Sequence, residues 1–330
     1  MFSTAVRRLN PISLYIYHVR TQHEHHFSDL TSLPDLCTEC SNVQNVLRNY
    51  LSKLKDLGVS GFRIDAAKHQ NPPDLANILK PFSNMLTLQE VIEGAGEAVK
   101  AEMYYDSGLV TEFRYGYCVG DTFLQNNNLD SLRTMNVSCD WMPSSNAVTF
   151  LNNHDTQRGQ APLTYKDGSV FDLANIFMLA WPYGYVRLMS SYYFDNFDQG
   201  PPNTPVFNAD GSTSCGDGTT WVCEHRNVAN MVRFRSVAAS ESVVNWNLIT
   251  NSQVSFSRGS KAFVILNNDR NNAIQNMDFN TGLPEGTYCN VIMSDDVQNC
   301  PTVSVDSSGK LSGASVSPVS ALAIHIGSKK

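Results

Sequence analysis

The chain has 330 residues, more than a single hydrophobic core usually holds, so we expect two unequal domains. Hydrophobic residues make up 42% and charged residues 17%, which is typical of globular proteins and excludes the disordered and fibrous classes. The formal net charge of -7 argues against nucleic acid as a partner, because binding phosphates requires clustered Lys and Arg. No apolar run reaches the roughly 20 residues that span a bilayer, so we expect no membrane association.

Residues 1–28 contain no convincing signal peptide. Arg7 and Arg8 precede a short apolar stretch at 12–19, as they would in a secretory signal, but Pro11 and His18 interrupt the pattern. We therefore expect no secretion signal in this segment.

The first well-formed element is a helix at 42–57. Its apolar residues recur at helical spacing and form one stripe: Val43, Val46, Leu47, Tyr50, Leu51, Leu54 and Leu57. Gly58 is placed to end the helix. The run at 59–65 that follows predicts a short strand.

Further strands are expected at 85–91, 109–113, 147–152 and 185–189, and helices near 121–132 and 171–180. Strands that alternate with helices predict parallel β/α units. Because a closed (β/α)₈ barrel needs eight strands and only five are found, we expect an open sheet or a barrel without its first three strands. From 238 onward, short β-rich stretches separated by Asn, Asp and Gly predict an antiparallel β-sandwich.

The eight cysteines divide into two groups. Cys215 with Cys223, and Cys289 with Cys300, are close pairs in loops, where short disulfides are plausible in a secreted protein. The others, with no evident partner, are Cys37, Cys40, Cys118 and Cys139. The segment 37–40 reads CTEC, which could be half a zinc site or a redox motif, but no second CxxC accompanies it. We favour ordinary cysteines there.

Three carboxylates, Asp65, Glu90 and Asp155, each follow a predicted strand. A single acid in this position is usually a helix cap or a solvated loop residue. In a parallel barrel, however, the carboxyl ends of successive strands meet, so acids at several of them converge on one site. Cleaving a glycosidic bond requires one carboxylate as nucleophile or base and a second as proton donor, which such a group would provide.

The neighbours of these acids suit that chemistry. Arg63 lies two residues before Asp65, on the same face of the strand, which places a guanidinium beside the expected nucleophile. Glu90 has apolar flanks, Leu88, Val91 and Ile92, as suits a general acid. The candidate substrate-binding residues, which could donate hydrogen bonds to sugar hydroxyls, are Lys68, His69 and His154.

The segments GFRIDAAKH (61–69), LQEVIE (88–93) and FLNNHD (150–155) resemble the second, third and fourth conserved regions of the α-amylase family, particularly its animal-type branch. The resemblance runs from about residue 29 to the C-terminus. It implies an unmatched segment at 1–28, a partial catalytic barrel (strands 4–8) at 29–237 and a C-terminal all-β domain at 238–330. The family's first conserved region has no counterpart, so we expect the first three barrel strands to be absent.

The resemblance also implies the reaction. Asp65 would be the nucleophile, Glu90 the acid/base and Asp155 the transition-state stabiliser in a retaining, endo-acting hydrolysis of α-1,4-glucosidic bonds. The substrates would be starch, glycogen and malto-oligosaccharides. The alternatives are a catalytically inactive amylase fragment and a noncatalytic carbohydrate-binding protein.

Two inorganic ligands follow from the same resemblance. Chloride would be bound by Arg63, Asn153 and Arg187. The positive charges of the two arginines have no further acidic partner that is obvious in the sequence, although they could instead pair with Asp65 and another carboxylate. Calcium would be bound by the side chain of Asp35 and the backbone carbonyl of His69. The family further implies secretion and a monomeric protein.

Overall fold

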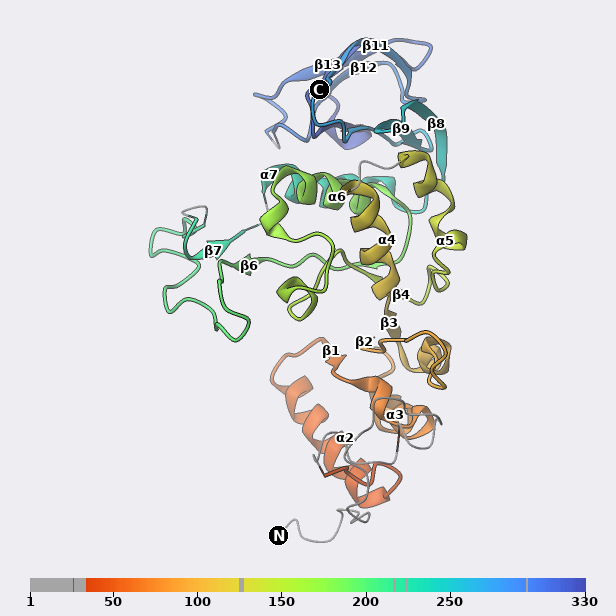
Figure 1. The fold of residues 1–330 in the computed structure, drawn as a ribbon, viewed down its shortest axis with the longest axis vertical. Coiled ribbons are helices and arrows are strands. Elements are labelled where there is room, and N and C mark those ends of the chain that lie inside the picture. The colour runs from red at the N-terminus through yellow and green to blue at the C-terminus, as the bar shows by residue number, and fades with distance from the viewer. Residues whose placement is uncertain (1–25, 27–33, 125–127, 216–217, 224, 295) are drawn as a thin grey trace. The chain divides into compact units, whose positions relative to one another are not determined.

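The computed structural model describes residue 26 and residues 34–330, apart from 125–127, 216–217, 224 and 295 (Figure 1). The chain divides into two compact units, Met1–Phe113 with Met142–Val148, and Arg114–Trp141 with Thr149–Lys330. The predicted segment 1–28 lies outside the described residues except for His26. The predicted boundary at 237/238 falls inside the second unit and remains a prediction.

The first unit is built on parallel strands that are paired in the order β1-β2-β3-β4. Arg63 pairs with Leu88 and Gln89 with Val110, so each strand follows its predecessor in the chain as a β/α repeat requires. The elements are α2 (Ser41–Asp56), β1 (Gly61–Ile64), η1 (Ala67–His69), α3 (Pro72–Leu79), η2 (Lys80–Phe82), β2 (Leu86–Gln89), η3 (Ala101–Ser107), β3 (Leu109–Thr111) and β4 (Ala147–Thr149). Helix α2 and the four strands confirm the predicted elements.

Helix α2 leaves much of its predicted apolar stripe uncovered. Gly58 follows it with a φ of 98°, a left-handed conformation that ends the helix. Val43 is buried, but Val46, Tyr50 and Leu57 have exposed fractions of 54%, 60% and 74%. A stripe that packs against neighbouring β/α units in a closed barrel therefore faces solvent in part.

The second unit begins with helices that differ from the prediction for 121–132. Helix α4 spans Phe113–Leu124, and a separate 3-10 helix, η4, spans Leu129–Thr134. Asn128 caps η4, its side chain accepting a hydrogen bond from the amide of Asp130. Asparagine favours caps over helix interiors, which explains why the continuous helix expected there is wrong.

The remaining β/α elements of the second unit are α5 (Met135–Ser138), η5 (Thr156–Arg158), η6 (Tyr165–Asp167), α6 (Ser169–Ala180), β5 (Tyr185–Val186), β6 (Ser191–Tyr192), β7 (Trp221–Val222) and α7 (Arg226–Ala238). Helix α6 and strand β5 confirm the predicted elements at 171–180 and 185–189. After β5, the amide of Arg187 donates to the carbonyl of Thr149, the last residue of β4, at 2.9 Å.

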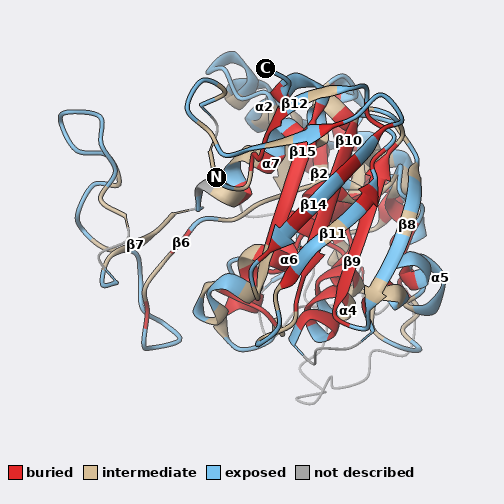
Figure 2. Ribbon diagram, turned by 90° about the horizontal axis from the view of Figure 1, so that it is seen from above, coloured by how far each residue is buried: buried red, intermediate tan, exposed pale blue. Residues whose placement is uncertain are grey.

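The C-terminal part is the predicted antiparallel sandwich. One sheet has the order β15-β10-β9-β8 and the other β11-β14-β13-β12. The strands are β8 (Val243–Thr250), β9 (Gln253–Arg258), β10 (Ala262–Asn267), β11 (Ile274–Asn280), β12 (Gly286–Cys289), β13 (Thr302–Val305), β14 (Lys310–Val316) and β15 (Ser320–His325), followed by η7 (Ile326–Ser328). Strands β9, β10 and β15 are buried along most of their length (Figure 2).

Helices α6 and α7 pack against each other and against β10 and β15 of the sandwich (Figure 1). Two arginines stabilise this junction. Arg258 donates to the carbonyls of Ala180, Ala239 and Glu241 at 2.7–2.8 Å. Arg235 donates to five carbonyls within 178–184. Burial, aided by the charge of Arg235, lowers the pKa of Arg258 to about 10, as expected for a guanidinium surrounded by peptide groups.

Four disulfides join the eight cysteines: Cys37–Cys40, Cys118–Cys139, Cys215–Cys223 and Cys289–Cys300. The last two confirm the predicted pairs, and the first two join the four cysteines for which the sequence showed no evident partner. Cys118 and Cys139 are 21 residues apart in sequence, and only the fold brings their Cα atoms within 6.6 Å. Within the described part of the chain, no helix has the length and apolar character needed to cross a bilayer.

Candidate active site

Strand β1 and the residue after it position Arg63 and Asp65 next to each other. Asp65 directly follows the strand, and its side chain is 75% exposed. Ala66 then adopts a left-handed φ of 46°, which turns the chain away from the strand into η1. Arg63 Nη1 donates to the Asp65 carboxylate. The predicted contact between these two residues is present.

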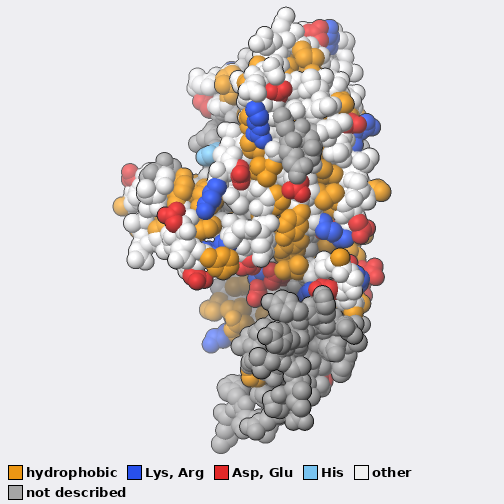
Figure 3. All heavy atoms as spheres, in the orientation of Figure 1, with side chains coloured by type: hydrophobic (Ala, Val, Ile, Leu, Met, Phe, Trp, Pro, Cys, Tyr) orange, Lys and Arg blue, Asp and Glu red, His pale blue; other side chains and the backbone are white. Residues whose placement is uncertain are grey.

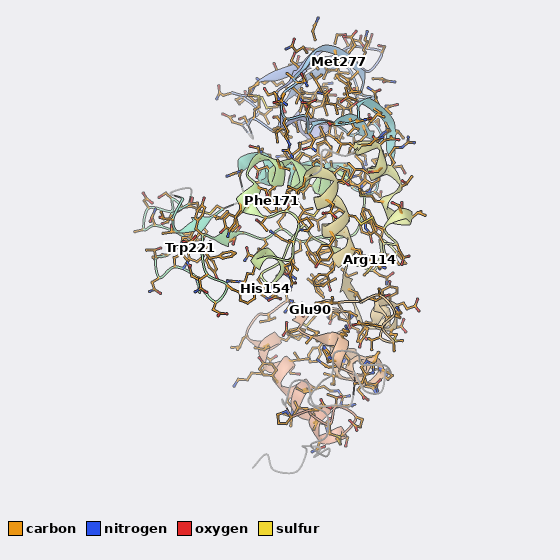
Figure 4. All side chains as sticks on the ribbon, viewed as in Figure 1. Glu90, Arg114, His154, Phe171, Trp221 and Met277 are labelled. Carbon is orange, nitrogen blue, oxygen red and sulfur yellow. A yellow bond between two sulfur atoms is a disulfide. The ribbon has the colours of Figure 1, made fainter. Side chains whose placement is uncertain are left out.

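Glu90 lies at the end of β2 and is buried, with an exposed fraction of 9% (Figure 4). Arg63 Nη2 is 3.0 Å from Glu90 Oε1, and the amide of Ala66 donates to Oε2 at 3.1 Å. The backbone amide of Glu90 donates to the carbonyl of Ile64, and the carbonyl of Glu90 accepts from the amide of Lys68. The apolar sequence neighbours of Glu90 therefore do not predict the environment of its carboxylate, which is polar.

Lys68 is held by a loop that follows β2. Its Nζ is 2.5 Å from Glu97 Oε2, and the same oxygen accepts from the amide of Gly94 at 3.0 Å. In the same loop, Glu93 accepts from Lys100 Nζ and from the amide of Ala101. Glu97 was not among the predicted site residues, because an acid in a Gly-rich loop carries no distinctive sequence signal.

Buried Tyr104 fixes the backbone around Lys68. Its hydroxyl oxygen lies 3.0 and 2.8 Å from the carbonyl oxygens of Lys68 and Gln70, which share its one proton. Burial raises the pKa of Tyr104 far above its usual value, so the hydroxyl remains a donor. His69, between these two carbonyls, is half-buried, and its amide donates to Ala66. Tyr104 is a second residue that the sequence did not single out.

The predicted calcium ligands are too few to form a site by themselves. No group of three or more His, Cys, Asp or Glu side chains converges anywhere in the described residues. Calcium in proteins takes about six to eight oxygen ligands. Asp35 and the carbonyl of His69 would supply two of these, so a calcium site here would need further oxygen ligands.

The second unit holds the third predicted acid. Asp155 and His154 are exposed, with His154 Nε2 3.2 Å from Asp155 Oδ2 (Figure 4). Buried Asn153 organises their turn, since its Oδ1 accepts from the amides of Asp155 and Thr156 at 3.0 and 2.8 Å. With the oxygen so occupied, the amide nitrogen of Asn153 is the group left to donate elsewhere.

The sequence-predicted residues thus form two groups. Arg63, Asp65 and Glu90 come together in the first unit, while Asn153, His154 and Asp155 do so in the second. Arg63 has a second acidic partner that is not obvious in the sequence, because β1 and β2 are neighbours and their pairing brings Glu90 to its second nitrogen.

A parallel β/α sheet with acids at its strand ends, joined to an antiparallel sandwich, is the arrangement of the barrel-type glycoside hydrolases. Residues 244–327 match the family model described as the α-amylase C-terminal all-beta domain. The α-amylase of Streptomyces violaceus is 41% identical over 302 residues, covering 90% of this chain and 50% of that protein. Pancreatic α-amylase of Sus scrofa is 38% identical, covering 91% and 65%.

The crystal structure of α-amylase I from Eisenia fetida superposes with a TM-score of 0.81 at 34% identity, covering 93% of this chain and 69% of that one. The chain belongs to the α-amylase family. It spans about half to two thirds of the length of the curated relatives it matches. The predicted fold, a partial barrel followed by a β-sandwich, is confirmed.

Proposed function

We propose that this chain carries the catalytic carboxylates of an endo-acting α-amylase that hydrolyses α-1,4-glucosidic bonds with retention. Family membership supports the reaction, and the Eisenia relative has been solved as a complex with maltohexaose. The observation that carries the proposal is the contact of one guanidinium, Arg63, with two carboxylates at adjacent strand ends. Starch, glycogen and malto-oligosaccharides are the proposed substrates.

The environments of the carboxylates match different tasks. Asp65 is exposed, so a sugar ring can reach it, and it would form the glycosyl ester as nucleophile. Buried Glu90 would donate a proton to the leaving oxygen and then remove one from water in the second step. Asp155 would stabilise the positive charge that develops on the sugar ring. Lys68, His69 and His154 are proposed to bind sugar hydroxyls.

Substitution of the two carboxylates tests the proposal. Asp65→Asn and Glu90→Gln are nearly isosteric, and each is expected to reduce the hydrolysis rate of soluble starch by at least about 10³-fold. The matched controls are Asp106→Asn and Glu102→Gln, at exposed positions of η3, which should keep the parent rate. If either site variant retains more than a trace of activity, the assignment of that residue is wrong. The anomer released first, followed by NMR, tests retention.

We propose further that Arg63, Asn153 and Arg187 bind chloride. The donor chemistry fits an anion: two guanidiniums and an amide nitrogen whose partner oxygen is already occupied. The contact of Arg63 with two carboxylates is the competing explanation for its charge. Line broadening of the chloride NMR signal distinguishes the two explanations. If the parent chain binds chloride, it should broaden this signal, and Arg187→Gln should broaden it less. A parent chain that causes no broadening would exclude the anion site. Calcium at Asp35 and His69 is proposed only as part of a larger ligand set.

A noncatalytic or inactive protein is the second candidate, and the exposed stripe of α2 favours it. With Val46, Tyr50 and Leu57 in solvent, the first unit lacks part of the packing that would hold a catalytic site rigid. Retention on insoluble starch without release of reducing sugar would support a binding protein. A chain that neither binds nor hydrolyses starch would be an inactive family member.

Secretion and a monomeric state are also proposed. Four disulfides support an oxidising, extracellular environment. On the visible face of the second unit, acidic and basic side chains are interspersed (Figure 3). Such a surface, with a net charge of -7, suits a neutral polysaccharide better than a nucleic acid.

A further inference from the structure

The Cys37–Cys40 disulfide differs from the other three in how short a loop it encloses. It encloses two residues, whereas the others join cysteines separated by 8, 11 and 21 positions. A bridge stabilises a fold mainly by restricting the unfolded chain, and the restriction decreases as the enclosed loop shortens. Stabilisation is therefore a weaker explanation for this bridge than for its counterparts.

Cys40 is the N-cap residue of α2, a helix of 16 residues. Its side chain makes no capping hydrogen bond while it is part of the disulfide, and the first turn of the helix contains no acidic residue. The amides of that turn and the helix dipole stabilise a negative charge at the N-cap. A thiolate on Cys40 would provide the capping acceptor that the helix lacks, so the reduced form is favoured here.

The turn that carries both cysteines is held by bonds that do not involve sulfur. The amide of Cys40 donates to the carbonyl of Cys37 at 3.0 Å, and the amide of Gln44 donates to the carbonyl of Cys40 at 3.0 Å. The side chain of Gln44 also donates to the carbonyl of Thr38 at 2.8 Å. Reduction leaves these bonds in place, so the two sulfurs stay close enough to be oxidised again.

We propose that Cys37–Cys40 is a reversible thiol–disulfide exchange site whose reaction partner is a dithiol of the thioredoxin class. One thiolate of the dithiol attacks a sulfur of the bridge, which breaks the Cys37–Cys40 bond, forms a mixed disulfide and releases the other cysteine. The second thiol of the dithiol then attacks the partner's own sulfur in the mixed disulfide and displaces the remaining cysteine. The partner leaves as a disulfide and has supplied two electrons and two protons. Cys37 and Cys40 become thiols, and Cys40 can then release its proton to solvent to cap α2 as a thiolate.

The test is a redox titration of the full chain in dithiothreitol buffers, with free thiols alkylated and each cysteine peptide quantified by mass spectrometry. Cys37 and Cys40 are expected to be half reduced at a reduced-to-oxidised dithiothreitol ratio about tenfold lower than any other pair. The helical circular dichroism signal should persist at that midpoint. If all four bridges open together, or the helical signal is lost with this one, the bridge is structural and the proposal is overturned.

A pair of variants isolates the contribution of the helix. Asn42→Asp, at an exposed position in the first turn of α2, places a negative charge beside the N-cap and should raise the required dithiothreitol ratio by about two- to fivefold. Asn45→Asp, also exposed and one turn further along, still accepts from Arg48 and should leave the ratio unchanged. Equal ratios for the parent and both variants would show that the helix does not favour the reduced form, which also overturns the proposal.

Discussion

Arg63 Nη2 lies 3.0 Å from Glu90 Oε1, and the other terminal nitrogen of the same guanidinium donates to Asp65. The parallel pairing of β1 and β2 sets this relationship, because it aligns Arg63 with Leu88 and so brings the ends of both strands to one level. The planar fork of arginine can contact two carboxylates at once. The positions of Asp65 and Glu90 therefore depend on one shared neighbour.

Replacing Arg63 by lysine should uncouple these two acids. Arg63→Lys keeps the positive charge but cannot hold both carboxylates in a fixed geometry, so kcat on a chromogenic maltoside should decrease by about 10- to 100-fold. The circular dichroism spectrum should not change. Arg48→Lys is the control and should keep the parent kcat, because the described contacts of Arg48 on α2 are with Gln44, Asn45 and Asn77 and not with the acids. Parent-like activity in Arg63→Lys would show that the shared contact is dispensable.

The exposed part of the α2 stripe should bind apolar probes. Val46→Ser with Tyr50→Ser is expected to reduce the fluorescence of a bound naphthalene sulfonate dye and to reduce aggregation, because both side chains face solvent. The free energy of unfolding should change by no more than about 0.5 kcal/mol.

The control for the dye experiment is Val137→Ser, which removes a single 77%-exposed side chain from the second unit. It should leave most of the dye signal intact. A double variant that loses several kcal/mol of stability would instead indicate that Val46 and Tyr50 are covered in solution.

The sequence predicted those features that depend on neighbours in the chain. Helix α2 and strands β1 to β5 follow from apolar periodicity, and Asp65 and Glu90 were recognisable because each directly follows a strand. Contacts between distant segments were missed. Nothing in the sequence relates Cys118 to Cys139, or Lys68 to Glu97, since each pair meets only after the intervening chain has folded.

The polar surroundings of Glu90 show why sequence neighbours do not predict the environment of a residue in the site. Its sequence neighbours are apolar, but β2 ends at Gln89, so strand alternation does not determine which groups surround the carboxylate of Glu90. Residues from β1 and the turn after it, Arg63 and Ala66, contact the carboxylate instead. Such contacts depend on which strands pair, and the spacing of residues along the sequence does not reveal this.

Removing Arg258 should destabilise the second unit strongly. In Arg258→Met, the carbonyls of Ala180, Ala239 and Glu241 lose their donor in a buried environment, so the free energy of unfolding in urea should decrease by about 3 kcal/mol or more. The control Arg233→Met changes an exposed arginine on α7 and should alter the free energy by no more than about 0.5 kcal/mol. Equal losses in both variants would contradict a special role for the buried guanidinium.

His325, at the end of β15, should make stability depend on pH. It is 1% exposed, and its ring lies edge-on to Phe234. Burial lowers its pKa from 6.5 to about 4, and the positive charge of Arg233 contributes. Between these two values the unfolded chain binds a proton that the folded chain does not, so acidification favours unfolding. The stability is present above the unfolded pKa of 6.5 and is lost as the pH falls towards 4.

Urea unfolding at several pH values between about 4.5 and 7 measures this effect, which should reach at most about 1.4 kcal/mol per pH unit. His325→Gln removes the titrating ring, so the free energy of unfolding should depend less on pH across this range even if the variant is less stable at neutral pH. The matched control is His154→Gln, at an exposed position of the second unit, which should keep the pH dependence of the parent chain. If His325→Gln and the parent lose stability equally on acidification, another group is responsible for the pH dependence.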